Sequence, residues 1–115
     1  MSGTLFLPND QRWSSSGWIY DNVLERMATI LVSKNNPTVA DKLLGARTEV
    51  NGGYLDFREA DTDILRLLLH TATEAYNQFK SEGASSFYMP EFYPGFMCQF
   101  DELLATLHAL ARTDR

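Results

Sequence analysis

The chain has 115 residues, of which 44% are hydrophobic, and its formal net charge at pH 7 is −5. This length is typical of a single domain, and the apolar content is sufficient for a core without disulfides or a structural metal. The excess of acidic residues argues against binding to nucleic acid or to an anionic membrane, because both kinds of binding depend on Lys and Arg. We therefore expect one domain, residues 1–115, with no cofactor.

Cysteine usage and the N-terminal sequence indicate the compartment. Cys98 is the only cysteine, so no intramolecular disulfide can form, and a lone thiol fits a reducing environment. Residues 1–9 lack the basic region and the apolar run of a signal peptide. No segment approaches the roughly 20 apolar residues that span a bilayer. The sequence therefore predicts a cytoplasmic protein.

The first half of the chain reads as an arm followed by two helices. Residues 1–16 look like an irregular arm in which Pro-Asn-Asp at positions 8–10 signals a turn. Apolar residues recur with helical spacing over residues 17–33, and the sequence Lys-Asn-Asn-Pro then ends this helix. A second, shorter helix is expected over residues 37–45, with Gly at its end.

Residues 47–57 are open to two interpretations. The dipeptide Asn51-Gly52 is a strong turn signal, and residues 54–57 alternate as a short strand or an extended segment would. Pairing of this segment with residues 47–50 would make a small β-hairpin. Two such short strands are marginally stable unless they pack on helices.

The second half of the chain carries the clearest helical pattern. Residues 62–80 place apolar side chains on one continuous face, and Asp61 or Thr62 is suited to cap this helix. A last helix is expected over residues 95–112. The sequence thus predicts a mainly all-α fold, a three- to four-helix bundle or orthogonal α domain. Its body spans residues 17–112 after the arm at 1–16, with at most one small β-hairpin near residues 47–57.

Catalytic patterns are weak in this chain. A nucleophile and base would have to combine Cys98 with His70 or His108, and local spacing does not bring Cys98 near either histidine. The glycines lack the spacing of a phosphate-binding loop. We therefore expect a protein that is not an enzyme.

An acidic cluster precedes the long helix and has three interpretations. Its four carboxylates are Asp56, Glu59, Asp61 and Asp63. Acidic residues at a helix N-terminus are stabilised by the macrodipole, which accounts for the cluster without any function. They could also coordinate a hard cation, but the EF-hand pattern is absent, so we expect no metal site. The third interpretation is an interface for a basic protein, with Tyr54 as an aromatic anchor beside the charges.

The segment 87–100 holds six aromatic residues in fourteen positions. One interpretation places Phe87, Phe92 and Phe96 in the core with the tyrosines outward. The other interpretation is a surface presented to a partner. Its residues would be Tyr88, Met89, Glu91 and Tyr93, with Trp18 as a further candidate anchor.

One stretch resembles a known class of proteins. Residues 54–69 read YLDFREADTDILRLLL, and a second amphipathic helix follows after an aromatic loop. Over residues 54–110 this arrangement resembles small acidic immunity proteins of bacterial toxin systems. The resemblance implies an intracellular inhibitor that neutralises a toxin, often a basic nuclease, by blocking its active site or an adjacent surface.

The leading hypothesis is therefore an immunity-like module that binds a basic partner. Its expected contacts are first the four carboxylates and then four further residues, Tyr54, Tyr88, Glu91 and Tyr93. The alternative is a structural or regulatory homo-oligomer, such as a homodimer, without a toxin partner. Its self-interface would involve Trp18, Leu67 and the aromatic segment.

Overall fold

The computed structural model describes residues 2–48, 52–87 and 89–113. Its elements in chain order are β1 (Ser2–Phe6), β2 (Arg12–Ser16), α1 (Gly17–Ser33), α2 (Pro37–Leu44), β3 (Tyr54–Asp56), α4 (Thr62–Glu82) and α5 (Tyr93–Thr113). Two 3₁₀ turns, η1 (Ala84–Ser86) and η2 (Pro90–Phe92), connect α4 to α5. The four predicted helices are thus confirmed, with ends that differ from the predicted ones by at most two residues.

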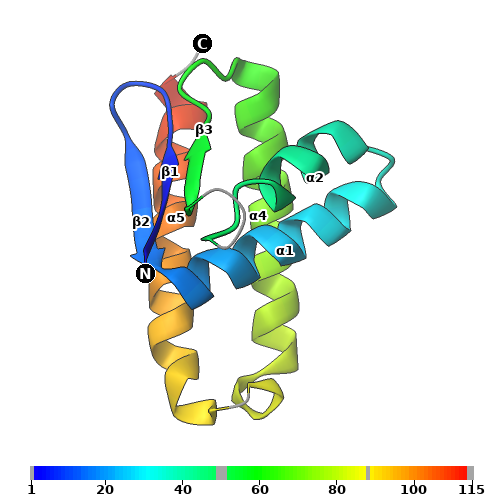
Figure 1. The fold of residues 1–115 in the computed structure, drawn as a ribbon, viewed down its shortest axis with the longest axis vertical. Helices are drawn as coiled ribbons and strands as arrows, with labels where there is room; N and C mark the ends of the chain where they lie inside the picture. The colour runs from blue at the N-terminus through cyan, green and yellow to red at the C-terminus, as the bar shows by residue number, and fades with distance from the viewer. Residues whose placement is uncertain (1, 49–51, 88, 114–115) are drawn as a thin grey trace.

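A long helical hairpin organises the molecule. Helices α4 and α5 run side by side along its longest axis, and α1 and α2 cross in front of them (Figure 1). Each of the two long helices has 21 residues and is therefore about 30 Å long. The turns η1 and η2 lie at one end of this hairpin. Asp61, just before α4, lies at the other. None of the described helices is long and apolar enough to cross a membrane.

The prediction of an irregular arm over residues 1–16 is wrong, because residues 2–16 form a β-hairpin. Strand β1 pairs with β2 in antiparallel register, with Leu5 opposite Trp13. Asn9 and Asp10 both have φ of 60°, a left-handed conformation that these residue types tolerate in a tight turn. Leu5 and Trp13 point to the same side and are both buried, so one face of the hairpin joins the core.

The predicted pairing at residues 47–57 differs from the structure, in which the third strand pairs with the N-terminal hairpin. Strand β3 pairs in parallel with β1, so the sheet has three strands in the order β2-β1-β3. Gly53 permits this approach: its φ is 77°, and a Cβ there would lie 2.7 Å from the Ser2 carbonyl oxygen. Residues 49–51, which include part of the expected hairpin, lie outside the described residues.

The core lies between the sheet and the helices, and all four helices contribute buried side chains to it. Tyr20 on α1 is fully buried beneath β1, and its hydroxyl donates a hydrogen bond to the Ala46 carbonyl at 3.1 Å. Burial, followed by the negative charge of Asp21, raises the pKa of Tyr20 above its usual value. Trp13 donates from Nε1 to the Gln99 carbonyl on α5 at 2.8 Å. These two bonds tie the hairpin and the segment after α2 to the helices.

Candidate functional site

A groove of about 1060 Å³ lies between α2, β3 and the start of α4. Its apolar lining includes Val39, Phe57 and Ile64. The charged residues that line it are Asp41, Lys42, Asp56, Arg58, Glu59 and Asp61. Four carboxylates thus face two cationic side chains, which leaves the groove with a negative excess.

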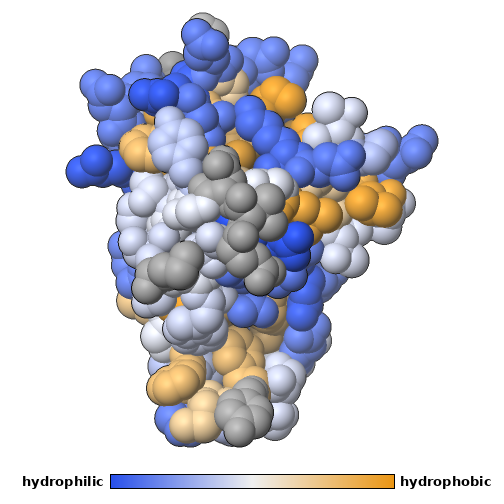
Figure 2. All heavy atoms as spheres, in the orientation of Figure 1, coloured by the Kyte–Doolittle hydropathy of each residue, from blue (hydrophilic) through white to orange (hydrophobic). Residues whose placement is uncertain are grey.

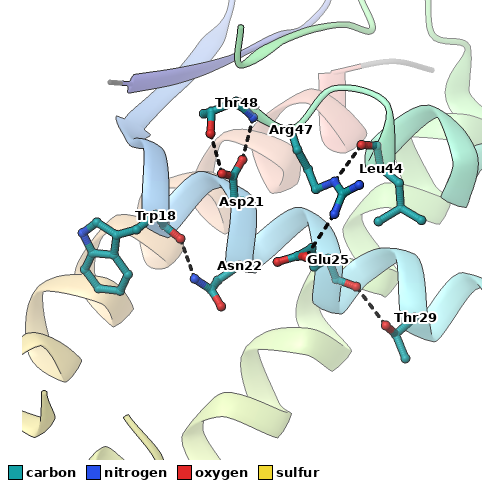
Figure 3. A network of polar contacts seen from close by, with 8 residues as sticks. All are labelled: Trp18, Asp21, Asn22, Glu25, Thr29, Leu44, Arg47 and Thr48. Atoms are coloured by element: carbon teal, nitrogen blue, oxygen red, sulfur yellow. Dashed lines mark hydrogen bonds and ion pairs between the residues drawn. The ribbon is translucent and has the colours of Figure 1, made fainter. Parts of the chain in front are cut away.

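A polar network fixes the segment that links α2 to β3. Asp21 on α1 accepts hydrogen bonds from both the backbone N–H and the hydroxyl of Thr48. Arg47 donates from Nε to the Leu44 carbonyl at 2.9 Å, and its guanidinium lies 3.3 Å from Glu25 (Figure 3). These contacts anchor the end of α2, and with it one wall of the groove, to α1.

Asp56 is held by its neighbour Arg58. The guanidinium donates to both carboxylate oxygens, from Nε to Oδ1 at 3.0 Å and from Nη2 to Oδ2 at 2.9 Å. The backbone N–H of Arg58 adds a bond of 2.9 Å to Oδ1. These hydrogen bonds lower the pKa of Asp56 to about 2, with the side-chain bond as the largest cause. Arg58 also donates to the Tyr54 hydroxyl at 3.2 Å, so two predicted contact residues belong to one cluster.

The other predicted acidic residues differ in their roles. Asp61 caps α4, because its Oδ1 accepts a bond of 2.9 Å from the backbone N–H of Ile64. Glu59 is exposed in the groove, between Arg58 and the start of α4. Asp63 is exposed in the first turn of α4 but is not one of the residues that line the groove. The structure therefore brings three of the four predicted carboxylates together.

Asp41 is a groove residue that the sequence reasoning did not identify. It lies on α2, fifteen or more positions before the predicted acidic cluster, and reaches the groove only because α2 folds against β3 and α4. Beside it, the Lys42 ammonium lies 4.3 Å from the centre of the Phe57 ring, a cation–π contact. No local pattern joins Asp41 to Asp56, because their proximity depends on tertiary packing.

The aromatic segment forms a second surface, which we call the aromatic patch and define as Trp18, Met89 and Phe92. These side chains are 42%, 38% and 49% exposed. The Trp18 ring lies 5.8 Å from that of Phe92 and 5.7 Å from that of buried Phe96. The interpretation that places Phe92 in the core is therefore wrong for this residue, whereas Phe96 is buried as that interpretation holds, and Phe100 is buried as well.

The remaining predicted residues of this segment lie around the patch. Tyr93 is half-buried, with its ring edge-on to Phe87 at 5.4 Å, and Glu91 is exposed in η2. Tyr88 lies outside the described residues. The three patch residues also line a hollow of about 420 Å³, so the patch is recessed in part.

The groove and the aromatic patch do not form one surface. Asp61 lies at one end of α4, and the turns that carry Met89 and Phe92 follow its other end, about 30 Å away (Figure 1). In Figure 2 apolar side chains gather at the end of the molecule where these turns lie, and hydrophilic side chains predominate at the opposite end. Because of this separation, a small partner protein would contact only one of the two surfaces at a time.

The candidate reactive groups are dispersed on the helices. Cys98 on α5 is exposed. His70 and His108 line one open depression along α4, and Cys98 is not part of it. Within the described ranges, no three His, Cys, Asp or Glu side chains are placed to hold a metal ion.

Comparison with protein-family models, curated proteins and solved structures finds no match to this chain. Its function is therefore inferred from its own residues.

Proposed function

We propose that this chain is a non-enzymatic module that binds a basic protein in the groove between α2, β3 and α4. The observation that supports this function is the combination of charge and shape in the groove. Carboxylates outnumber cationic side chains by four to two around an apolar lining in a space of about 1060 Å³. Such a surface attracts a basic partner at long range and still offers apolar area for close contact.

Two carboxylates are best suited to contact the partner. Asp41 and Glu59 form no ion pair with any other described residue. Asp56 is already engaged by Arg58, and Asp61 caps α4. A partner cation at Asp41 or Glu59 would therefore not have to displace an existing contact. Asp56 and Asp61 would contribute mainly to the negative field of the groove.

The proposed mechanism is inhibition by occlusion, in the manner of the immunity proteins that the sequence resembles. A toxin domain that acts on nucleic acid needs a basic surface to hold phosphates. An acidic groove competes for that same surface, because it presents carboxylates where the toxin would otherwise meet phosphates. The module would then act in the cytoplasm and neutralise its partner without changing it covalently.

The test measures binding to the purified protein encoded beside this chain in its genome. We expect the double reversal Asp41→Lys/Glu59→Lys to lower affinity by about tenfold or more at low salt, mainly through a slower association rate. Glu102→Lys is the single-site control, because Glu102 is exposed on α5 outside the groove. The Asp101→Lys/Glu102→Lys variant matches the charge change of the double reversal on that same helix.

Equal loss of affinity in the groove and control variants would indicate a non-specific effect of net charge and would contradict the proposed site. Unchanged affinity of the groove variant would contradict it as well.

A further inference from the structure

Lys42 is a cationic side chain inside a groove that otherwise carries an excess of carboxylates. Its ammonium lies 4.3 Å from the centre of the Phe57 ring, which is within the range of a cation–π contact. Phe57 lines the groove but is only 5% exposed, so the free chain keeps this ring covered. The groove therefore contains an aromatic face that already accommodates a positive charge.

The two cations of the groove are held in different ways. Arg58 donates two side-chain hydrogen bonds to Asp56 and a third to the Tyr54 hydroxyl. The Lys42 ammonium forms no ion pair with any residue in the described part of the chain. Lys42 is exposed and its side chain is long and flexible. It can therefore leave the ring at little cost, whereas Arg58 would have to break several bonds.

The position of Lys42 in α2 accounts for its charge but not for its contact with the ring. Lys42 lies in the last turn of α2, where the macrodipole stabilises a cation. This stabilisation does not require the side chain to fold over Phe57. The hydrogen bonds from Arg58 are the largest causes of the lowered pKa of Asp56, and the charge of Lys42 contributes to it as well. The groove itself thus stabilises a positive charge beside the Phe57 ring.

An arginine of a partner would gain more at this ring than Lys42 does. An exposed cation–π contact is worth about two- to fivefold in an equilibrium constant, and a desolvated one about thirtyfold. Arginine also stacks on aromatic faces and is more weakly hydrated than lysine, so it loses less on burial. The difference favours replacement of Lys42 once a partner covers the groove.

We infer that Lys42 occupies, in the free chain, the position on the Phe57 ring that an arginine of the basic partner takes on binding. This inference rests on the proposed function, because it names one contact within the same groove. Lys42 then acts as an internal competitor that every partner must replace. A lysine of the partner gains little by this exchange, so the groove selects arginine over lysine.

The test uses tetra-arginine with blocked ends, compared with blocked tetra-lysine, each titrated to about 5 mM into the full chain and followed by NMR. The chain has three lysines, Lys34, Lys42 and Lys80, so few ε-methylene signals need assignment. The ring current of Phe57 should shift the Lys42 signal upfield in the free chain. Tetra-arginine should return this signal toward the other two, and should bind about threefold or more tightly than tetra-lysine.

Two substitutions of Lys42 separate the ring contact from net charge. Lys42→Ala uncovers the ring and should raise the affinity for tetra-arginine by about five- to tenfold. Lys42→Arg keeps the charge but holds the ring more strongly, so it should lower the affinity by about two- to threefold. Lys80→Ala is the matched control, because Lys80 is exposed toward the other end of α4, outside the groove. Its effect should stay below about twofold.

Four results would overturn the inference. They are a Lys42 signal that tetra-arginine does not move, equal affinity for the two peptides, equal gains in Lys42→Ala and Lys80→Ala, and a Lys42→Arg variant that binds as tightly as the unaltered chain. If Asp41→Lys/Glu59→Lys still weakens peptide binding in such a case, the groove remains the site and only the role of Lys42 is wrong. If that variant also has no effect, the proposed function fails as well.

Discussion

The close approach of β1 to Tyr20 yields a sharp prediction for Gly3→Ala. A Cβ atom at Gly3 would overlap the Tyr20 ring. The ring cannot retreat easily, because it is fully buried, lies 6.3 Å from the Trp13 ring and donates from its hydroxyl to Ala46. We therefore expect this substitution to destabilise the fold strongly, although it adds a single methyl group.

The magnitude has two contributions. Overpacking of a core by a methyl group costs about 1–3 kcal/mol. If Tyr20 shifts to relieve the overlap, its hydroxyl and the Ala46 carbonyl lose their bond, at a further cost of about 1–3 kcal/mol. The expected loss of about 2–6 kcal/mol is a large part of the 5–15 kcal/mol that typically stabilises a domain.

Urea unfolding followed by circular dichroism measures this loss. With an m-value of about 1.5 kcal/mol/M, the midpoint should fall by about 1.3 M or more. Gly95→Ala is the control, because a Cβ there meets nothing within 4 Å and Ala is the better helix former in α5, by up to about 1 kcal/mol. A Gly3→Ala midpoint within about 0.3 M of the unaltered protein would refute the packing of β1 on Tyr20.

Two further predictions concern the acidic cluster. Asp61→Ala removes the cap of α4 and should lower the free energy of unfolding by about 1 kcal/mol; an unchanged urea midpoint would contradict the capping role. For Asp56, NMR titration should find a pKa of about 2 that returns toward about 4 in Arg58→Gln. Because the pKa is lowered in the folded protein, this pair stabilises the fold above about pH 4, and the contribution is lost as the pH falls toward 2. A pKa near 4 in the unaltered protein would show that the pair does not persist in solution.

The helices could be predicted because their information is local. Apolar spacing marked residues 17–33 and 62–80, and a capping carboxylate marked the start of the long helix, where Asp61 accepts from Ile64. The sheet could not be predicted in the same way. Strand β2 reads RWSSS, in which Trp13 is the only large apolar residue, and β3 pairs with a strand about fifty residues earlier. Short strands of this kind are defined by their partners, which local periodicity does not reveal.

The sequence by itself determined the acidic character of the chain, its helices and the carboxylates at the start of α4, since these follow from composition and short-range spacing. Only the tertiary structure decided which of these residues meet. Packing of α2 against β3 added Asp41 to the groove, and the length of α4 placed Phe92 and Trp18 at the opposite end from Asp61. The physical reason is that a binding surface is assembled from several elements, whereas each helix is specified largely by its own turns.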